Sequence, residues 1–317
     1  MSNARRAIGL DIGGTKIAGA VVAEDGSMLA ELTEPTPDVS DAATMTALLL
    51  EMVEKLRAQH PDVVAIGVGA AGTVEWPTGR IRWAPNNAYR DWEIRAELES
   101  ATGLPAVVDN DANVAGLAEA RLGDTRWSDM ILVTVGTGVG SGIVLGGKIY
   151  RGPHGLGAEL GHIIVNPDGP RCGCGNYGCL EAYASGTALT HMGRESAADD
   201  PDGLIATLAR EAGVEVTGQT VTKAALQGDL AAQELFGRLG RWLGVGIASM
   251  TTIFELEAVV IGGGLVHTGD LLLGPTRLAA REFAYALEAR PLVPVVPGTF
   301  GSDAGKIGAA LLALDHA

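Results

Sequence analysis

Three cysteines and a histidine lie in the stretch E-L-G-H-I-I-V-N-P-D-G-P-R-C-G-C-G-N-Y-G-C-L-E, which spans residues 159–181. Cys172, Cys174 and Cys179 are all the cysteines of the chain, and His162 precedes the first of them by ten positions. Three thiolates and one imidazole make a complete tetrahedral shell for zinc. The interspersed glycines allow the short loop to fold tightly enough for its sulfurs to converge. The stretch therefore predicts a structural zinc site, because four protein ligands leave no open position for a substrate.

Free buried thiols and a disulfide are the alternatives to a metal site. The clustering is typical of metal loops, and the odd count without a secretory signal argues against a disulfide. Glu159 and Glu181 flank the loop, and Glu159 would share a face with His162 if that segment is helical. A metal loop that gathers polar side chains is typical of the wall of a polar pocket. Each glutamate taken alone could equally be a solvated surface charge.

A second polar run, D-N-D-A-N at residues 109–113, follows an apolar strand over 106–109 and precedes an expected helix over 114–122. Ligands of open α/β sheets bind at the carboxyl ends of strands, where this run lies. Helix capping is a simpler role, since Asp and Asn are good N-caps. One cap needs one residue, however, and the run supplies four polar ones. We therefore predict that Asp111 has a functional role.

The elements that would position these residues include one hairpin pattern that occurs twice. Residues 7–22 and 131–145 both read as an apolar strand, a glycine turn and a second apolar strand. A third glycine turn ends an expected strand over 257–265. Any one of these clusters could be a tight turn and nothing more. The repeated hairpin predicts a duplicated fold with a ligand bound between its halves.

Helices and strands alternate along the whole chain, which predicts an α/β fold with a largely buried sheet. Helices are expected at 45–56, 92–102, 230–254 and 306–314, and glycines 237, 240, 244 and 246 indicate close helix packing. Two segments resemble nucleotide-binding motifs in sequence but lack a feature that the motif requires. Residues 67–72 match a dinucleotide fingerprint but precede a turn-like segment rather than a helix, and the P-loop-like run 142–148 is followed by Ile149 instead of Ser or Thr. Residues 186–222 look helical but carry no motif.

Composition limits the classes of function. The 317 residues are enough for two domains, and the net charge of −15 argues against a nucleic-acid surface, which needs a basic face. Anionic nucleotides remain compatible, because loops can hold them with backbone N–H groups. The apolar run near the N-terminus is broken at Asp11, so neither a signal peptide nor a membrane anchor is expected. The chain is expected to be cytoplasmic.

Four motifs together resemble the ROK family of bacterial repressors and sugar kinases. They are D-I-G-G-T-K at 11–16, D-N-D-A-N at 109–113, G-T-G-V-G-S-G at 136–142 and E-x-G-H…C-x-C-G-x-x-G-C-x-E at 159–181. The resemblance implies an actin/hexokinase-like (ribonuclease H-like) fold with two domains and an active-site cleft between them. The implied small domain is 1–110 plus 303–317, and the implied large domain is 111–302 with the zinc loop at 162–179.

The resemblance also implies a role for each matching residue. Asp111 matches the catalytic base that takes the proton of the sugar 6-hydroxyl, and Asp11 matches a carboxylate near the Mg²⁺ site. The implied sugar-binding residues are Asn86, Asn110, Asp111, Glu159, His162 and Glu181. The residues implied in phosphate and adenosine binding are Gly13, Gly14, Thr15, Lys16, Gly136, Thr137, Gly138, Gly262, Gly263 and Gly264. His162 would bind zinc through one ring nitrogen and face the sugar with the other.

Within the family the sequence most resembles ATP-dependent bacterial glucokinases, which implies ATP and Mg²⁺ as cofactors, a role in glycolysis and a homodimer or homotetramer. Such an enzyme positions the phosphoryl group and neutralises its charge, while buried Asn, Glu and His pair with sugar hydroxyls. The alternatives are kinases of N-acetylmannosamine, N-acetylglucosamine, mannose or fructose, a polyphosphate donor, and a non-catalytic sugar-sensing regulator. We expect an intact general base at Asp111 and no DNA-binding domain. Both expectations count against the regulator.

Overall fold

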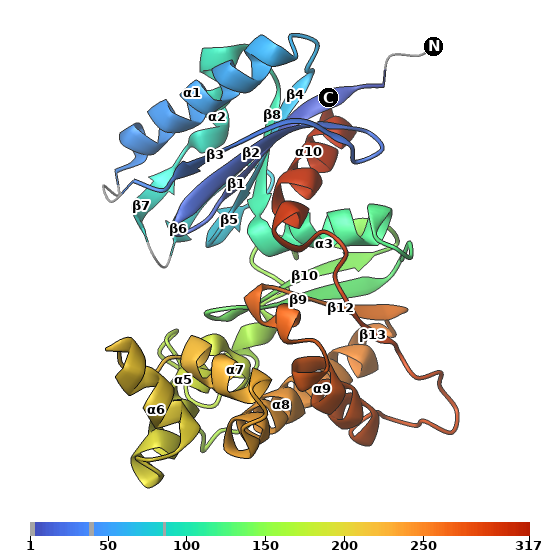
Figure 1. The fold of residues 1–317 in the computed structure, drawn as a ribbon. Helices are drawn as coiled ribbons and strands as arrows, with labels where there is room; N and C mark the ends of the chain where they lie inside the picture. Colours follow the sequence, from blue (N-terminus) through green and yellow to red (C-terminus); the bar gives the residue numbers. More distant parts are fainter. Residues whose placement is uncertain (1–3, 38–40, 85–86) are drawn as a thin grey trace. The chain divides into compact units, whose positions relative to one another are not determined.

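The first of two five-stranded sheets is built from the N-terminal third of the chain (Figure 1). The computed structural model describes residues 4–37, 41–84 and 87–317. The strands of this sheet are β1 (Arg6–Ile12), β2 (Lys16–Ala23), β3 (Met28–Pro35), β4 (Ala65–Ala70) and β8 (Ala106–Asn110). They are ordered β3-β2-β1-β4-β8, with β1 antiparallel to β2 and parallel to β4. The expected hairpin over 7–22 is confirmed.

The second five-stranded sheet repeats this topology. Its strands are β9 (Met130–Val135), β10 (Val139–Leu145), β11 (Lys148–Tyr150), β12 (Ala258–Gly262) and β13 (Val295–Pro297). They are ordered β11-β10-β9-β12-β13. When the five strands of each sheet are numbered in chain order, both sheets have the strand order 3-2-1-4-5. The duplication expected from the repeated hairpin is therefore confirmed.

The chain divides into two compact units. Unit 1 consists of residues 1–132, 142–158 and 298–317, and unit 2 of residues 133–141 and 159–297. The division crosses strands β9 and β10 within the repeated hairpin. Compactness does not test which segments fold or move together. The domain boundaries implied by the resemblance, 1–110 plus 303–317 against 111–302, therefore stay a prediction.

Helices cover both faces of the first sheet in unit 1 (Figure 1). Their bounds are α1 (Ala42–Gln59) and α2 (Ile94–Thr102) on one face, and α3 (Asp111–Leu122) and α10 (Ala304–His316) on the other. The apolar side of α1 buries Met45, Leu49 and Leu56 completely, because these residues recur with the period of a helix. Strand β1 has buried side chains on both of its faces, so its sequence is almost continuously apolar.

Helix α10 approaches the sheet closely enough to need glycine on its neighbours. A Cβ atom at Gly9 of β1 would collide with the backbone carbonyl of Lys306, and one at Gly67 of β4 would collide with that of Ala309. Within α10 itself, a Cβ at Gly308 would collide with the carbonyl of Val114 in α3. Backbone therefore contacts backbone on both sides of α10, and no larger residue fits at these positions.

A three-stranded sheet follows β4 where a nucleotide-binding helix would have stood. Its strands are β5 (Thr73–Glu75), β6 (Arg80–Ala84) and β7 (Asn87–Trp92). The glycine run over 67–72 thus leads from one strand into another. The rejection of the dinucleotide fingerprint is confirmed.

Unit 2 is mostly helical outside its strands. Its helices are η1 (Leu160–His162), α4 (Glu181–Ala184), α5 (Gly186–Asp199), α6 (Leu204–Ala212), α7 (Gly218–Leu226), α8 (Leu230–Phe254), η2 (Gly264–Thr268) and α9 (Asp270–Glu282), while η3 (Gly301–Asp303) belongs to unit 1. The long helix expected over 230–254 is confirmed. In the described part of the chain, no helix combines the length and apolarity needed to span a bilayer.

The glycines of α8 mark close packing at three of the four expected positions. A Cβ at Gly240 would lie 2.7 Å from Pro275 Cγ, and one at Gly244 would lie 2.7 Å from the backbone nitrogen of Ala280, both in α9. Gly246 packs in the same way against the side chain of Leu180. The expectation is wrong for Gly237, where a Cβ would meet no atom within 4 Å.

Candidate active site and metal centre

The three cysteines and His162 converge in unit 2. The Cys172 Sγ atom lies 3.8 Å from His162 Nδ1, and the Sγ atoms of Cys174 and Cys179 lie 3.6 Å apart. The four ligand atoms are all within 4.8 Å of one another. Ligands that surround zinc tetrahedrally at about 2.3 Å lie about 3.8 Å apart. The cluster therefore fits zinc, and the three cysteines are free thiols rather than members of a disulfide.

The three thiols differ in their ionisation. Burial raises the pKa of Cys172 to about 12, and it raises the pKa of Cys179 as well. The pKa of Cys174 is lowered, chiefly by the backbone N–H of Asn176. Thiolates packed this closely repel one another unless a cation lies between them, and a bound metal supplies that charge and deprotonates the thiols.

Glu181 connects the cysteine loop to the glycine turn between β9 and β10. Its Oε1 atom lies 3.5 Å from Cys172 Sγ, and its Oε2 atom accepts a 2.9 Å hydrogen bond from the backbone N–H of Val139. A Cβ atom at Gly138 would collide with the same carboxylate. The carboxylate of Glu181 thus lies against both loops, where glycine leaves it room.

Glu159 and His162 lie one helical turn apart, as expected. The backbone N–H of His162 donates to the carbonyl of Glu159 over 3.0 Å, which closes the short 3₁₀ helix η1. The backbone N–H of Leu160 donates to Ser141 Oγ over 3.0 Å and ties this turn to β10. The imidazole points its Nδ1 atom at the cysteines, which leaves Nε2 on the other side of the ring.

A cavity of about 490 Å³ opens beside the glycine turn of unit 2. Gly136, Thr137, Gly264 and Leu265 line it together with residues of α5, of α7 and of the α7 N-cap, which are Gly186, Thr187, Thr190, Thr217, Gly218, Gln219 and Thr222. The glycine turn is tied to the start of α5 by hydrogen bonds from Gly186 N to Gly136 O (2.7 Å) and from Thr187 N to Thr137 O (3.2 Å). Hydroxyls and the N-terminus of a helix are groups that bind phosphate oxygens.

A second cavity of about 470 Å³ shares four of these lining residues and adds Lys223 and His267. The two cavities together have room for a ligand as large as a nucleotide. Of the three glycines expected near adenosine, Gly264 lines both cavities, while Gly262 and Gly263 do not line either. Sequence reasoning missed the threonines of residues 186–222, because they come together only when α5 and α7 pack.

In unit 1, acidic side chains lie at the carboxyl ends of two parallel strands of the first sheet, β1 and β8. Asp11 of β1 is paired with Gly69 of β4, and Gly69 is in turn paired with Asp109 of β8. The two carboxylates therefore start from the same level of the sheet, two strands apart. Gly305 in the first turn of α10 leaves room for Asp11, whose Oδ2 atom would lie 2.6 Å from a Cβ there.

Helix α3 begins at Asp111, three residues before the expected start at Val114. The reason is that Asn110 caps the helix: its Oδ1 atom accepts from the backbone N–H groups of Ala112 (3.0 Å) and Asn113 (3.2 Å). Its Nδ2 atom donates to the carbonyl of Gly72 over 3.2 Å. Capping thus accounts for Asn110 and leaves Asp111 in the first turn without the capping role.

The carboxylates of Asp111 and Asp11 have raised pKa values. Burial is the main cause for Asp111, although hydrogen bonds from Ala112 and from its own backbone oppose the shift. Burial and repulsion from Asp111 raise the pKa of Asp11 to about 7, against the attraction of Lys16 and Lys306. A partly buried acidic group whose ionisation is shifted by a second carboxylate is typical of functional sites.

The turn that carries Gly13, Gly14, Thr15 and Lys16 is held by backbone and side-chain bonds. Gly13 N donates to Lys16 O over 3.0 Å, and Thr36 Oγ1 donates to Gly13 O over 2.8 Å. Gly14, Thr15 and Lys16 are exposed, which keeps their polar groups accessible to a ligand. Asn86, the remaining expected sugar contact, lies outside the described residues.

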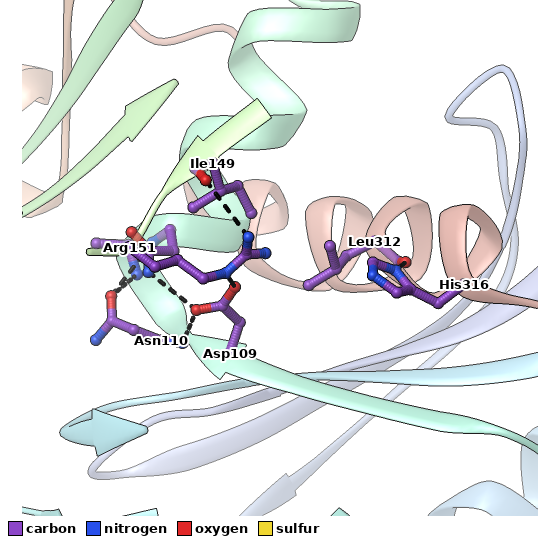
Figure 2. Close-up of polar contacts among 8 residues, drawn as sticks. Asp109, Asn110, Ile149, Arg151, Leu312 and His316 are labelled. Carbon is purple, nitrogen blue, oxygen red and sulfur yellow. Dashed lines mark hydrogen bonds and ion pairs between the residues drawn. The ribbon is translucent and has the colours of Figure 1, made fainter. Parts of the chain in front are cut away.

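An ion pair that no sequence pattern indicated lies beside this acidic cluster. Arg151 Nε donates to Asp109 Oδ2 over 2.6 Å, and both side chains are largely buried (Figure 2). In the sequence, Asp109 is only the first residue of a polar run, and Arg151 belongs to no motif. The two residues are separated by 42 positions, so only folding brings them together.

Residues 7–316 match the sequence pattern of the ROK family. A glucokinase of Streptomyces coelicolor is 40% identical over 309 residues, covering 96% of each chain. An N-acetylmannosamine kinase of Escherichia coli is 33% identical over 311 residues, covering 96% of this chain and 97% of its own. The crystal structure of a ROK family glucokinase from Streptomyces griseus, in complex with glucose and AMPPNP, is 39% identical, with a TM-score of 0.85 and coverage of 98% and 99%.

Proposed function

The chain belongs to the ROK family, and we propose that it is a glucokinase, which transfers the γ-phosphate of ATP to the 6-hydroxyl of glucose. The similarity to glucokinases and the actin/hexokinase-like fold support an ATP-dependent sugar kinase. The observation that carries the proposal is Asp111, a partly buried carboxylate in the first turn of α3, close enough to Asp11 to raise its pKa.

Asp111 is the proposed general base. A base works best when its pKa lies near the operating pH, because it must be ionised and still take up a proton. Burial moves the pKa of Asp111 in that direction. Asp111 would accept the proton of the sugar hydroxyl as that oxygen attacks the γ-phosphorus.

The proposed sugar ligands are Asn86, Asn110, Asp111, Glu159, His162 and Glu181. Each supplies an amide, carboxylate or imidazole atom that can pair with a hydroxyl, and a buried hydroxyl without a partner costs about 1–3 kcal/mol. His162 would present Nε2 to the sugar, since Nδ1 faces the cysteines. The polar groups of these side chains and their match to the family motifs support their assignment as sugar ligands.

The proposed nucleotide site uses the glycine turns and the cavity of unit 2. Gly136, Thr137, Gly138 and the turn over 13–16 would hold phosphates through backbone N–H groups, and the region around Gly262–Gly264 would contact adenosine. Mg²⁺, held near Asp11, would supply positive charge to the phosphates when bound. The acidic group of Asp11 is a suitable partner because oxygen ligands are those that Mg²⁺ prefers.

Zinc has a proposed structural role at His162, Cys172, Cys174 and Cys179. It would supply no step of the reaction, because the four protein ligands complete its shell. Its effect would be to hold the imidazole of His162 and, through the contact of Cys172 with Glu181, the carboxylate of Glu181. Both residues are proposed sugar ligands.

An N-acetylmannosamine kinase is the second candidate, supported by the relatives at 33% identity. The same motifs would serve either sugar, and the difference would lie in the room beside the sugar 2-position. Glucokinases of three relatives are 34–40% identical to this chain, against 33% for the N-acetylmannosamine kinase, which favours glucose. A homodimer or homotetramer is proposed for either, to be checked by light scattering of the purified chain.

The test is a coupled ADP-release assay of zinc-loaded protein with ATP and Mg²⁺. The sugars would be glucose, mannose, fructose, N-acetylglucosamine and N-acetylmannosamine. We expect glucose to give the highest kcat/KM. Highest turnover of N-acetylmannosamine would select the second candidate. No turnover of any sugar, with ATP and then with polyphosphate as donor, would refute a sugar kinase.

A further inference from the structure

We propose that Arg151 and Asp109 form a positioning pair, which fixes the orientation and the electrostatic surroundings of Asn110 and Asp111. The inference rests on the proposed function, in which these two residues bind the sugar and act as base. Neither Arg151 nor Asp109 belongs to the proposed sugar or nucleotide contacts. Their effect would be exerted through the residues that do.

Asp109 holds the first turn of α3 at two points. Its Oδ1 atom accepts from the backbone N–H of Asn110 over 2.8 Å and from Nδ2 of Asn113 over 2.9 Å. Asp109 is only 3% exposed, and the Oδ1 atom of the similarly buried Asn113 has no hydrogen-bond partner among the described residues. The orientation of the Asn113 amide therefore depends on Asp109, and Asp111 lies between the two anchored residues.

Arg151 in turn fixes the other oxygen of Asp109 (Figure 2). Its Nε atom donates to Asp109 Oδ2 over 2.6 Å, and its Nη1 atom donates to the carbonyl of Ile149 over 3.4 Å. The guanidinium carbon lies 3.7 Å from the centre of the Trp76 ring, an arrangement that favours a cation over the aromatic face. These contacts give the guanidinium a single well-defined position.

The ring of Trp76 is itself packed against the last turn of α10. It meets the ring of His316 edge-on at 5.7 Å between centroids, and His316 Nδ1 lies 2.8 Å from the carbonyl of Leu312. The result is a continuous series of contacts from the last turn of α10 to the first turn of α3, all within unit 1. Figure 2 shows the guanidinium of Arg151 next to the carboxylate of Asp109, with Leu312 and His316 of α10 to one side.

Stability alone does not account for such a pair. A buried ion pair is often no more stabilising than apolar residues of similar volume, because both charges lose their hydration. The charge balance around the proposed base offers a better reason. Asp111 follows Asp109 by two residues and repels Asp11, Lys16 on β2 and Lys306 on α10 attract Asp11, and Arg151 balances the charge of Asp109.

Removal of Arg151 and removal of Asp109 should therefore shift the pKa of Asp111 in opposite directions. In Arg151→Met, Asp109 is an unbalanced negative charge that favours the protonated form of Asp111, so the acid limb of kcat/KM should move to higher pH. In Asp109→Asn, Arg151 is an unbalanced positive charge, so the limb should move to lower pH. A neighbouring charge in such a setting shifts a carboxyl pKa by about one unit.

The double variant Asp109→Asn/Arg151→Met removes both charges and should return the acid limb close to its original pH. The sugar KM should rise in both single variants, because the backbone N–H of Asn110 then donates to a side chain at position 109 that is held less firmly. Arg121→Met is the matched control: it breaks an exposed ion pair of the same unit, with Asp315, and should leave the limb unchanged. Thermal unfolding of each variant identifies any that fails to fold.

Opposite shifts in the two single variants, with recovery in the double variant, would support the positioning pair. Loss of activity with the acid limb unmoved, or shifts of the same sign, would overturn it. If Arg151→Met does not fold, Asp109→Asn decides by the direction of its shift, because it keeps the size of the side chain. Failure of the proposed function is distinguishable: the unsubstituted protein would then phosphorylate no sugar.

Discussion

The carboxylate of Glu181 accepts a 2.9 Å hydrogen bond from the backbone N–H of Val139, directly after the glycine turn between β9 and β10. Its other oxygen lies 3.5 Å from the sulfur of Cys172. The proposed zinc site and the proposed phosphate turn therefore share one side chain. Loss of the metal should therefore weaken the binding of both the sugar and the nucleotide.

Replacement Cys174→Ser should abolish zinc binding and weaken the binding of sugar and nucleotide together. Three remaining ligands hold zinc poorly, and the loop then no longer fixes His162 and Glu181. Zinc content would be measured by atomic emission, and the affinities for glucose and a non-hydrolysable ATP analogue by calorimetry. Tyr177→Phe, in the same loop and with an exposed side chain, is the control that should keep all three. Normal glucose affinity in zinc-free protein would disprove the coupling.

Replacement Asp111→Asn should lower kcat by about 10³-fold, in the range that a positioned general base contributes. Binding of the sugar should change little, because the amide keeps the size and one oxygen of the carboxylate. Single-turnover kinetics and glucose calorimetry separate the two effects. Asp124→Asn, an exposed change in the same unit, serves as control. Full activity of the Asp111 variant would show that the base is another group.

Replacement Asp11→Asn should stabilise the protein above neutral pH. The pKa of Asp11 is about 7 in the folded protein and 3.8 for an unperturbed aspartate, so folding binds a proton between these pH values. The stability linked to Asp11 is complete below pH 3.8 and is lost as pH rises through 7. The side chain is partly exposed, so we expect a gain of about 2 kcal/mol at pH 8, shrinking toward pH 4.

Urea unfolding at several pH values, without Mg²⁺, would measure this gain. The same variant should lose kinase activity, since Asp11 is proposed to lie near Mg²⁺. A stability gain that does not depend on pH would contradict the assigned cause. A loss of stability at pH 8 would mean that the charge of Asp11 is compensated in the folded protein.

Replacement Gly308→Ala should destabilise unit 1 by more than about 3 kcal/mol, because the new methyl group would collide with the carbonyl of Val114 and rigid backbone must move. Gly274→Ala in α9 is a matched change inside a helix, and its methyl group meets no atom within 4 Å. That variant should be stabilised by about 0.5–1 kcal/mol through helix propensity. Thermal unfolding of both proteins measures the difference, and equal stabilities would refute the close packing of α10.

Patterns of local sequence predicted most of the secondary structure and the metal cluster. The hairpins, the long helix over 230–254 and the four proposed zinc ligands each depend on residues close together in the chain, whose spacing carries the information. The expected start of α3 was wrong by three residues. The polar run over 109–113 reads as a loop, yet Asn110 supplies the cap and Asp109 a partner for Asn113, which together extend the helix through it.

Contacts between distant residues could not be predicted. Arg151 meets Asp109 across 42 positions, and the threonines of α5 and α7 line a cavity with Gly136 and Gly264. None of these residues has a type or spacing that marks it, because each depends on how whole helices and strands pack. The roles of the individual site residues likewise stay proposals until the variants are measured.

The close packing of α10 has a consequence for biosynthesis. Its backbone contacts β1 and β4 directly, although it is the last helix of the chain and they are among the first strands. During translation, α3 alone can cover that face of the first sheet until residues 304–316 have left the ribosome. We expect the newborn N-terminal segment to be the part of the protein that most needs a chaperone.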